Sequence, residues 1–298
     1  MDKRLETFLV LCRVMNYRES SEILHISQPA VTKQIQSLEE EYGVELFDYD
    51  RRKLTRTPAS YILEKYAHAQ KYNYEDVKKA LQESRVRTLR IGVSKTVGDY
   101  LIVDELKNFL KISSQPLEIK IDNTESLLEH LQESRLDFLI IEGNFDKGDY
   151  DYRLYGEEMF AGICAKDHPF AGREVPLKEI FSESIVVREK GSGTREIVES
   201  GLKAFGYDFA DFFREISVNS IQIIRDLVAE QLGISFAYTT IIDKDDRLAH
   251  FQVKELTAPH EVHVLALKNT QGLRHAEHFF NTPGAFPDKI ESDSIKEE

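Results

Sequence analysis

Several features of membrane and secreted proteins are missing from this sequence of 298 residues. It has no run of about 18 apolar residues that could span a bilayer. It also has no basic segment followed by a short apolar one, as in a secretory signal. We therefore expect a cytoplasmic protein with no membrane partner. Only two cysteines occur, Cys12 and Cys164, each inside an apolar run, which predicts buried reduced thiols and neither a disulfide nor a zinc site.

Catalytic and nucleotide-binding motifs are also missing. The stretch 191–193 (GSG) lacks the G-x-S-x-G spacing of a nucleophile elbow, and no Walker or G-x-G-x-x-G motif occurs. The pairs His260/His263 and His275/His278 are three residues apart, a spacing that suits a metal only if further ligands converge. We interpret them as surface or hydrogen-bonded histidines. The sequence thus predicts no enzyme activity, no catalytic residues, no cofactor and no metal.

Charge is unevenly distributed along the chain. The net charge is −13 and the pI is about 5.3, which is unfavourable for binding nucleic acid. Residues 1–90, however, hold 16 basic and 14 acidic side chains, whereas the remainder holds 23 and 38. Because the acidity belongs to the larger C-terminal part, the overall charge does not exclude a DNA-binding surface near the N-terminus.

The stretch 20–38 (SSEILHISQPAVTKQIQSL) predicts a helix, a three-residue turn and a second helix. Ser27 is a suitable N-cap, and a proline in the first turn costs the second helix no hydrogen bond. Helical spacing places three apolar residues on one buried side. Polar side chains on the other side suit the major groove of DNA, although any soluble amphipathic helix has a polar side. The buried set is Val31, Ile35 and Leu38, and the candidate DNA-contacting set is Gln28, Pro29, Thr32, Lys33 and Gln36.

Two features after this helix pair favour the DNA-binding interpretation. Short extended segments at Val44–Phe47 and Lys53–Thr57 flank a charged turn, which predicts a β-hairpin wing. Four cations gather there, and beside a recognition helix they favour phosphate contact over a merely solvated surface. From Pro58 to about Arg85 a glycine-free stretch predicts a long helix that pairs with a second copy of itself. The wing cations are Arg51, Arg52, Lys53 and Arg56, and the apolar stripe of the long helix is Ile62, Tyr66, Ala69, Val77, Ala80 and Leu81.

The remaining 200 or so residues alternate between short apolar strands and helical segments, which predicts mostly parallel sheets covered by helices. In such folds ligands bind beyond the carboxyl ends of the strands, near helix N-termini that attract anions. Each small polar residue at a strand end is, by itself, explained as an N-cap. Their recurrence predicts one polar cleft for a small, anionic effector. These residues are Ser94, Thr96, Asn123, Thr124, Ser192, Gly193, Thr194, Asn219 and Ser220.

The N-terminal region resembles the LysR-type family of bacterial transcriptional regulators, on the strength of SQPAVTKQIQSLE (27–39) and the residues around it. The resemblance implies a winged helix-turn-helix followed by a linker helix. Five positions in the helix pair and the wing depart from the family pattern. Ser20 and Ser21 replace small alanines, Arg18 stands where a capping threonine is usual, and Arg56 and Ser60 replace the leucine and glycine of the wing.

The C-terminal part resembles the periplasmic-binding-protein-like effector domain of the same family, through LRIGVSKTVGDYL, RLDFLIIEG, VVREKGSGTREIVE and LVAEQLGISF. The expected fold is multidomain: an N-terminal all-α winged helix-turn-helix with a long linker helix, then an α/β two-lobed domain. The resemblance implies two lobes joined by two crossover strands. The expected boundaries are 1–58 (winged domain), 59–87 (linker), 88–160 with 266–283 (lobe I), 161–265 (lobe II) and 284–298 (disordered tail).

Together these features predict a sequence-specific regulator that binds double-stranded operator DNA, responds to a small effector and self-associates as a homodimer or homotetramer. One alternative from another class remains open at this point. The chain could be a cytoplasmic small-molecule binding protein or a ligand-handling enzyme whose N-terminal helices serve only for oligomerisation.

Overall fold

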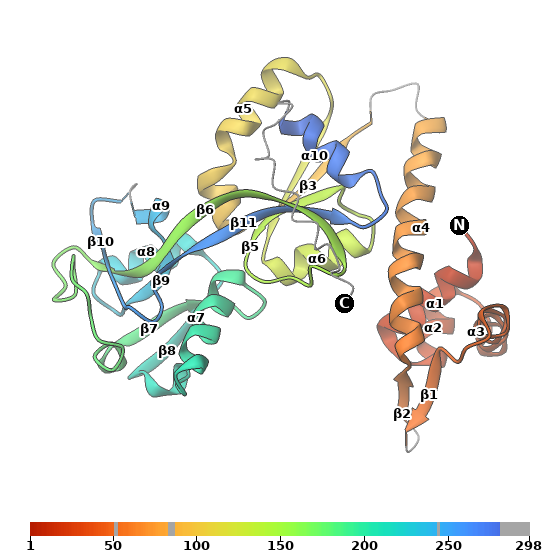
Figure 1. Cartoon of the computed structure of the whole chain (residues 1–298), viewed down its shortest axis with the longest axis horizontal. Coiled ribbons are helices and arrows are strands. Elements are labelled where there is room, and N and C mark those ends of the chain that lie inside the picture. Colours follow the sequence, from red (N-terminus) through yellow and green to blue (C-terminus); the bar gives the residue numbers. More distant parts are fainter. Residues whose placement is uncertain (51–52, 83–86, 243–244, 281–298) are drawn as a thin grey trace, which may run out of the picture. The chain divides into compact units, whose positions relative to one another are not determined.

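A computed structural model describes residues 1–50, 53–82, 87–242 and 245–280, so the predicted tail at 284–298 lies outside the described part of the chain. The chain forms two compact units (Figure 1). One is Met1–Arg87 with the short segments Gln132–Ser134 and Leu267–Gln271, and the other contains the rest. Among the described helices, none is both long enough and apolar enough to cross a membrane.

The first unit is a helical domain with a two-stranded hairpin. The predicted apolar side of its third helix is buried, with Val31, Ile35 and Leu38 at most 1% exposed. Ile35 and Leu38 pack in a core with Phe8, which is fully buried. The prediction of an amphipathic recognition helix is therefore confirmed on its buried side. The elements are α1 (Lys3–Val14), α2 (Tyr17–Leu24), α3 (Gln28–Tyr42), β1 (Phe47–Asp50), β2 (Lys53–Arg56) and α4 (Pro58–Gln82).

Capping residues define the helix-turn-helix. Asn16 is the N-cap of α2, and its side chain accepts hydrogen bonds from the backbone N–H groups of Arg18 (2.9 Å) and Glu19 (3.1 Å). Arg18 is thus inside the helix, and its interpretation as a replaced cap was wrong. His25 ends α2 in the left-handed conformation (φ 54°), and Ser27 caps α3 by accepting from the Ala30 N–H at 3.3 Å.

The two serines that replace alanines are accommodated without unpaired hydroxyl groups. Ser20 and Ser21 are buried, and a buried hydroxyl requires a hydrogen-bond partner. The Ser20 hydroxyl donates to the carbonyl of Asn16 (2.8 Å), and that of Ser21 donates to the carbonyl of Arg18 (2.7 Å). Both bonds stay within α2 or its cap, so these substitutions leave the helix-turn-helix intact.

The wing begins later than predicted. The segment Val44–Phe47 was expected to be a strand, but β1 starts at Phe47. The residues before it are held by the end of α3 instead. The Val44 N–H donates to the carbonyl of Glu39 (3.1 Å), and the Glu39 carboxylate accepts from the Leu46 N–H (2.8 Å). Local hydrogen bonding to the helix end therefore competes successfully with strand formation here.

The second unit contains parallel βα layers connected by long antiparallel strands. β3 pairs in parallel with β4 and β5, and β7 pairs in parallel with β8, as the alternation of strands and helices predicted. β6 and β11 run the length of this unit (Figure 1) and correspond to the crossover strands that the family resemblance implied. Its strands are β3 (Leu89–Ser94), β4 (Leu117–Asp122), β5 (Phe138–Glu142), β6 (Tyr150–Ala165), β7 (Ser184–Arg188), β8 (Arg214–Val218), β9 (Ser235–Tyr238), β10 (Leu248–Phe251) and β11 (Ala258–Leu267).

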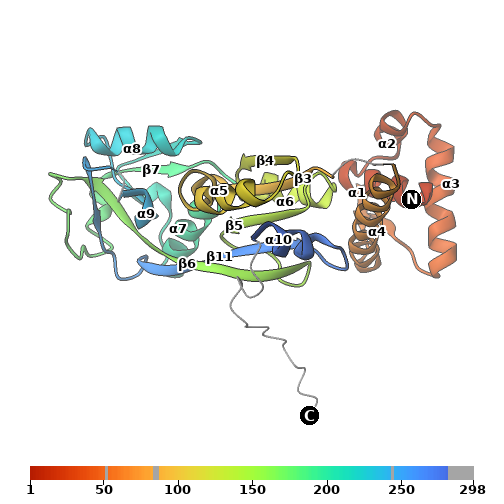
Figure 2. The same ribbon diagram turned by 90° about the horizontal axis from the view of Figure 1, so that it is seen from above.

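Helices cover the strands on both sides. In β7, Val186 packs with the core under α8, whereas Val187 packs with the core under α7. Because successive side chains of a strand point to opposite faces, the two helices lie on opposite sides of β7, as Figure 2 shows. The helices are η1 (Val97–Leu101), α5 (Val103–Ile112), α6 (Thr124–Gln132), η2 (Ile180–Ser182), α7 (Gly193–Ala204), η3 (Phe209–Asp211), α8 (Ile221–Ala229), α9 (Thr239–Ile242) and α10 (Gly272–Phe280).

Candidate functional site

The five candidate DNA-contacting residues of α3 lie along one side of the helix, within an arc of about 140° at 100° per residue. Four of these side chains are exposed, and Thr32 is half-buried because its hydroxyl donates to the carbonyl of Gln28 (3.2 Å). The exposed groups offer amide donors and acceptors together with one ammonium, which are the groups that read base edges and phosphates. The four exposed residues are Gln28, Pro29, Lys33 and Gln36.

The structure describes two of the four predicted wing cations, Lys53 and Arg56. β1 and β2 pair antiparallel, and Lys53 at the start of β2 is exposed. Arg51 and Arg52 lie outside the described residues. Arg56 is engaged within the domain: its guanidinium pairs with the Glu64 carboxylate at 2.5 Å and covers the Tyr61 ring at 3.9 Å from the centroid. Arg56 therefore anchors the wing to α4, and this engagement competes with its predicted phosphate contact.

In the second unit, the candidate effector residues divide between two groups of strand ends. On the β3 and β4 side, Ser94 and Thr96 are buried, and Asn123 caps α6 by accepting from the Ser126 N–H at 2.9 Å. The Thr124 hydroxyl donates to the carbonyl of Glu142 at 3.3 Å. Asn123 thus acts as an N-cap, which is the ordinary role of a small polar residue at the start of a helix. Ser94, Thr96 and Thr124 instead surround the end of β5.

The other group follows β7 and β8. The Ser192 and Thr194 hydroxyls hydrogen-bond to each other at 2.9 Å, so neither caps the first turn of α7. Ser220 does act as a cap, because its hydroxyl accepts from the Ile223 N–H (3.4 Å). The Asn219 side chain is exposed. The N-terminus of α7 is consequently left with backbone N–H groups that no Ser192 hydroxyl satisfies.

Direct contacts bring the two groups together. The Lys95 ammonium lies 3.0 Å from the Glu189 carboxylate and donates to the carbonyl of Asn219 at 2.6 Å. Two glycines meet at the same place: a Cβ on Gly143 would lie 2.8 Å from the Cα of Gly193. No larger residue fits there without displacing backbone. Residues predicted from separate strand ends therefore form one cluster across the two lobes.

Four charged residues of this cluster were missed by reasoning from the sequence, which considered only small polar residues at strand ends. All four adjoin those ends, so position along the chain was the available signal. Arg188, 6% exposed, donates to the Glu189 carboxylate from Nε (2.8 Å) and an Nη (3.1 Å). We name the whole set the strand-end cluster: Ser94, Lys95, Thr96, Thr124, Glu142, Arg188, Glu189, Ser192, Gly193 and Thr194.

The two carboxyl groups of the strand-end cluster have opposite pKa shifts. Burial raises the pKa of Glu142, although the Ser94 hydrogen bond and the charge of Arg188 oppose this effect. Burial also acts to raise the pKa of Glu189, but the hydrogen bond and charge of Arg188, with the Lys95 ammonium, outweigh it and the pKa is lowered. The surroundings of Glu189 thus favour its anionic form, whereas burial shifts Glu142 towards its neutral form.

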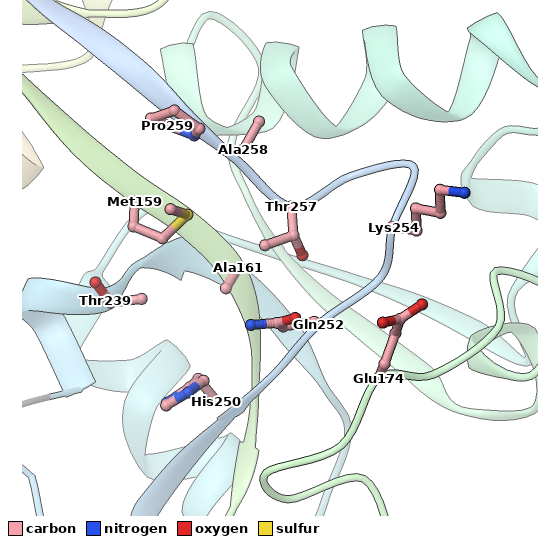
Figure 3. A pocket seen from close by; sticks show the side chains of 10 residues that line it. All are labelled: Met159, Ala161, Glu174, Thr239, His250, Gln252, Lys254, Thr257, Ala258 and Pro259. Carbon is pink, nitrogen blue, oxygen red and sulfur yellow. The ribbon is translucent and has the colours of Figure 1, made fainter.

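A separate pocket of about 610 Å³ lies on lobe II (Figure 3). Phe251 of β10 faces Gly162 of β6 and is fully buried, so its neighbours His250 and Gln252 project from the opposite face. No residue predicted to bind the effector lines this pocket. Its lining combines apolar and polar side chains: Met159, Ala161, Glu174, Thr239, His250, Gln252, Lys254, Thr257, Ala258 and Pro259.

Comparisons with known proteins agree with both halves of this description. Residues 3–60 match the bacterial regulatory helix-turn-helix proteins of the lysR family, and residues 82–282 match the LysR substrate binding domain. The chain is 29% identical over 257 residues to the HTH-type transcriptional regulator CysL of Bacillus subtilis (strain 168), covering 85% of this chain and 84% of the relative. It is 25% identical over 287 residues to a probable RuBisCO transcriptional regulator of Porphyra purpurea, covering 93% and 90%.

Solved structures show the same fold. Full-length BenM superposes with a TM-score of 0.56 at 18% identity, covering 95% of this chain and 96% of BenM. The regulatory domain of Synechocystis PCC6803 CcmR, in complex with 2-PG, superposes with a TM-score of 0.58 at 23% identity, covering 65% of this chain and 96% of that domain. The alternative of a ligand-handling enzyme is not supported, since the family is one of transcriptional regulators. The chain belongs to the LysR family: it is a DNA-binding transcriptional regulator with an effector-binding domain.

Proposed function

We propose that the exposed side of α3 reads the major groove of operator DNA while the wing contacts the phosphate backbone. The supporting observation is the pattern on α3, where exposed hydrogen-bonding groups lie opposite a fully buried apolar stripe. Gln28, Lys33 and Gln36 would contact bases or phosphates, and Lys53 would add a phosphate contact from β2. A regulator of this kind needs to share a compartment with DNA, so the proposal includes a cytoplasmic location.

The proposal includes self-association through α4. Four side chains of the predicted stripe are 49–83% exposed, and they lie within an arc of about 100°. Pairing with a second α4 would bury this stripe and place two recognition helices roughly 34 Å apart, as a pseudo-palindromic operator requires. Ala69 of the predicted stripe faces the core, and the Ala80 side chain is outside the described part. The stripe is Ile62, Tyr66, Val77 and Leu81.

We further propose that a small, anionic effector binds at the strand-end cluster. Support comes from its convergent hydroxyl groups, from the α7 N-terminus and from the buried Arg188. In the present arrangement Lys95 bridges the two lobes directly. Effector binding would replace such bridges, shift the population of lobe arrangements and so change the spacing of the DNA-reading domains.

A gel-shift assay with genomic fragments at two salt concentrations tests the DNA-binding part. Binding should prefer particular fragments and weaken with salt, because phosphate contacts release counterions. Binding that is insensitive to salt or to sequence would contradict the assignment of α3 and the wing.

Thermal-shift screening tests the effector site. The ligands would be sulfur anions, carboxylates and amino acids, with 2-PG, which the CcmR regulatory domain binds, and shikimate, which the QuiR effector binding domain binds. A stabilising ligand should lose its effect in Thr96→Ala and Thr194→Ala but keep it in Thr257→Ala, which alters the separate pocket of Figure 3. The reverse pattern would place the effector in that pocket.

A further inference from the structure

Glu142 is an unusual member of the strand-end cluster because its carboxyl group is buried without a countercharge. The residue ends β5 and is 1% exposed. Its carboxyl accepts a hydrogen bond from the Ser94 hydroxyl. No Lys, Arg or His side chain in the described ranges forms an ion pair with it, whereas nearby Glu189 has two cationic partners. A carboxylate in such a position would be strongly destabilised, so the group takes up a proton instead.

Groups from several elements face this carboxyl. Arg188 on β7 is the cation that favours ionisation, but both of its hydrogen bonds to a carboxylate go to Glu189. Tyr238, at the end of β9, is near enough that burial and the charge of Glu142 raise its pKa. Ser94 and Thr96 add two hydroxyl groups. The groups around the Glu142 carboxyl are therefore one cation that is already paired with Glu189, one phenol and two hydroxyl groups. This set favours the neutral acid.

Two of these neighbours have hydroxyl groups that form no hydrogen bond of good geometry with a described residue. Thr96 Oγ1 lies beside the Glu142 carboxyl without a hydrogen bond of good geometry, and the Tyr238 hydroxyl likewise has no partner among the described residues. Both residues are 1% exposed. Buried polar groups are nearly always paired, and unpaired ones indicate a missing ligand or water. Thr96, Tyr238 and the protonated Glu142 would all be donors, which suits an acceptor.

We propose that Glu142 is held as a neutral carboxylic acid that donates a hydrogen bond, together with the hydroxyl groups of Thr96 and Tyr238, to an anionic oxygen group of the effector. The location of the effector rests on the proposed function, but the protonation state of Glu142 does not. Ionised Glu142 would repel the anion and could not donate. Anion binding therefore requires the proton on Glu142, and affinity falls as the pH rises through the pKa of this group.

Infrared spectroscopy of the ligand-free, full-length protein tests the protonation state. With isotope-labelled glutamate at neutral pH, the wild type should show the carbonyl stretch of a protonated carboxylic acid. Glu142→Gln should lose this band, and Glu40→Gln, the control at an exposed glutamate of α3, should retain it. A spectrum in which Glu142→Gln removes only a carboxylate band would overturn the inference, whatever the effector is.

Calorimetric titration with sulfate and with acetate tests the coupling to anions. Both probes keep a constant charge between about pH 6 and about pH 8, so a change in affinity reports the protein. Above the pKa of Glu142, the wild-type dissociation constant should rise roughly tenfold per pH unit, and Glu142→Gln should abolish this dependence. A preference for sulfate or for acetate would distinguish the sulfur or phosphorus oxyanions from the carboxylates.

The two proposals fail in different ways. The effector location is wrong if neither anion binds between about pH 6 and about pH 8, or if binding survives Thr96→Ala. The infrared result still decides the protonation state of Glu142 in that case. If anions bind with an affinity independent of pH and the acid band is missing, the inference about Glu142 is wrong while the effector location stands.

Discussion

The recognition side of α3 and the strand-end cluster both contain threonine and lysine among other polar residues, but they use these polar groups in opposite ways. On α3 the polar groups are exposed and come from adjacent turns of one helix. In the strand-end cluster they are mostly buried, come from segments up to 100 residues apart and bond to one another. Substitutions on α3 should therefore leave folding largely unaffected, whereas those in the strand-end cluster should affect stability as well as the proposed ligand binding.

The largest expected effect comes from forcing the two lobes apart. In Gly193→Ala the new Cβ would lie 2.5 Å from the Glu142 carbonyl oxygen, a backbone atom that cannot move alone. We expect the free energy of unfolding to fall by about 1–3 kcal/mol, as for other overpacked positions. Urea unfolding followed by circular dichroism measures it. Gly156→Ala is the control, since its Cβ meets nothing within 4 Å. Equal effects of both variants would show that the close approach is unimportant.

On α3 we expect the reverse, a functional effect without a stability effect. Gln28→Ala should reduce discrimination between operator and non-operator DNA by about 1–3 kcal/mol, as the loss of a base contact does. Its unfolding free energy should stay within about 0.5 kcal/mol of the wild type, because the side chain is exposed. Fluorescence anisotropy with paired DNA duplexes measures discrimination. The exposed Glu6, on α1, provides the control Glu6→Ala. Unchanged discrimination in Gln28→Ala would remove this residue from the interface.

The two carboxyl groups of the strand-end cluster should respond to pH with opposite signs. The pKa of Glu142 is raised on folding, so its ionisation reduces stability as the pH rises above the unfolded value of about 4.3, and Glu142→Gln should become relatively more stable towards neutral pH. The pKa of Glu189 is lowered, so its contribution exists above the unfolded value and is lost as the pH falls through the folded one.

Glu189→Gln should accordingly destabilise the protein at neutral pH and have little effect in acid. Unfolding free energies measured across this range for the two variants and the wild type check both signs. Each pKa unit corresponds to about 1.4 kcal/mol. Two variants with parallel pH profiles would contradict the difference between these carboxyl groups.

The smallest effect is expected at Arg56. Like the polar residues of the strand-end cluster, this residue of the helical unit is engaged with its own domain. Arg56→Ala removes the ion pair with Glu64 and should reduce stability by about 0.5–1 kcal/mol. It should weaken binding to all DNA sequences only slightly, whereas Lys53→Ala should weaken it more and lower its salt dependence. A larger loss of DNA affinity for Arg56→Ala would place Arg56 in the interface.

Much of the helical unit was predictable because its determinants are local. The cap at Ser27, the left-handed Gly43 after α3 and the apolar spacing of Val31, Ile35 and Leu38 each act within a few residues. The start of β1 was predicted too early because the Glu39 carboxylate, which holds Leu46, acts across seven residues. The crossover strands β6 and β11 came from the family resemblance, since a strand that crosses between two lobes has no single hydrophobic period.

The sequence by itself determined that this protein has a helix-turn-helix with a polar recognition side, a wing, a long helix and alternating βα units, because periodicity and capping are local. Only the tertiary structure decided which strand-end residues are caps and which belong to a common cluster, that Arg56 is engaged with Glu64, and that Glu142 is buried with no ion-pair partner among the described residues. These properties depend on groups distant in the chain, whose mutual burial and hydrogen bonding arise only when the lobes pack together.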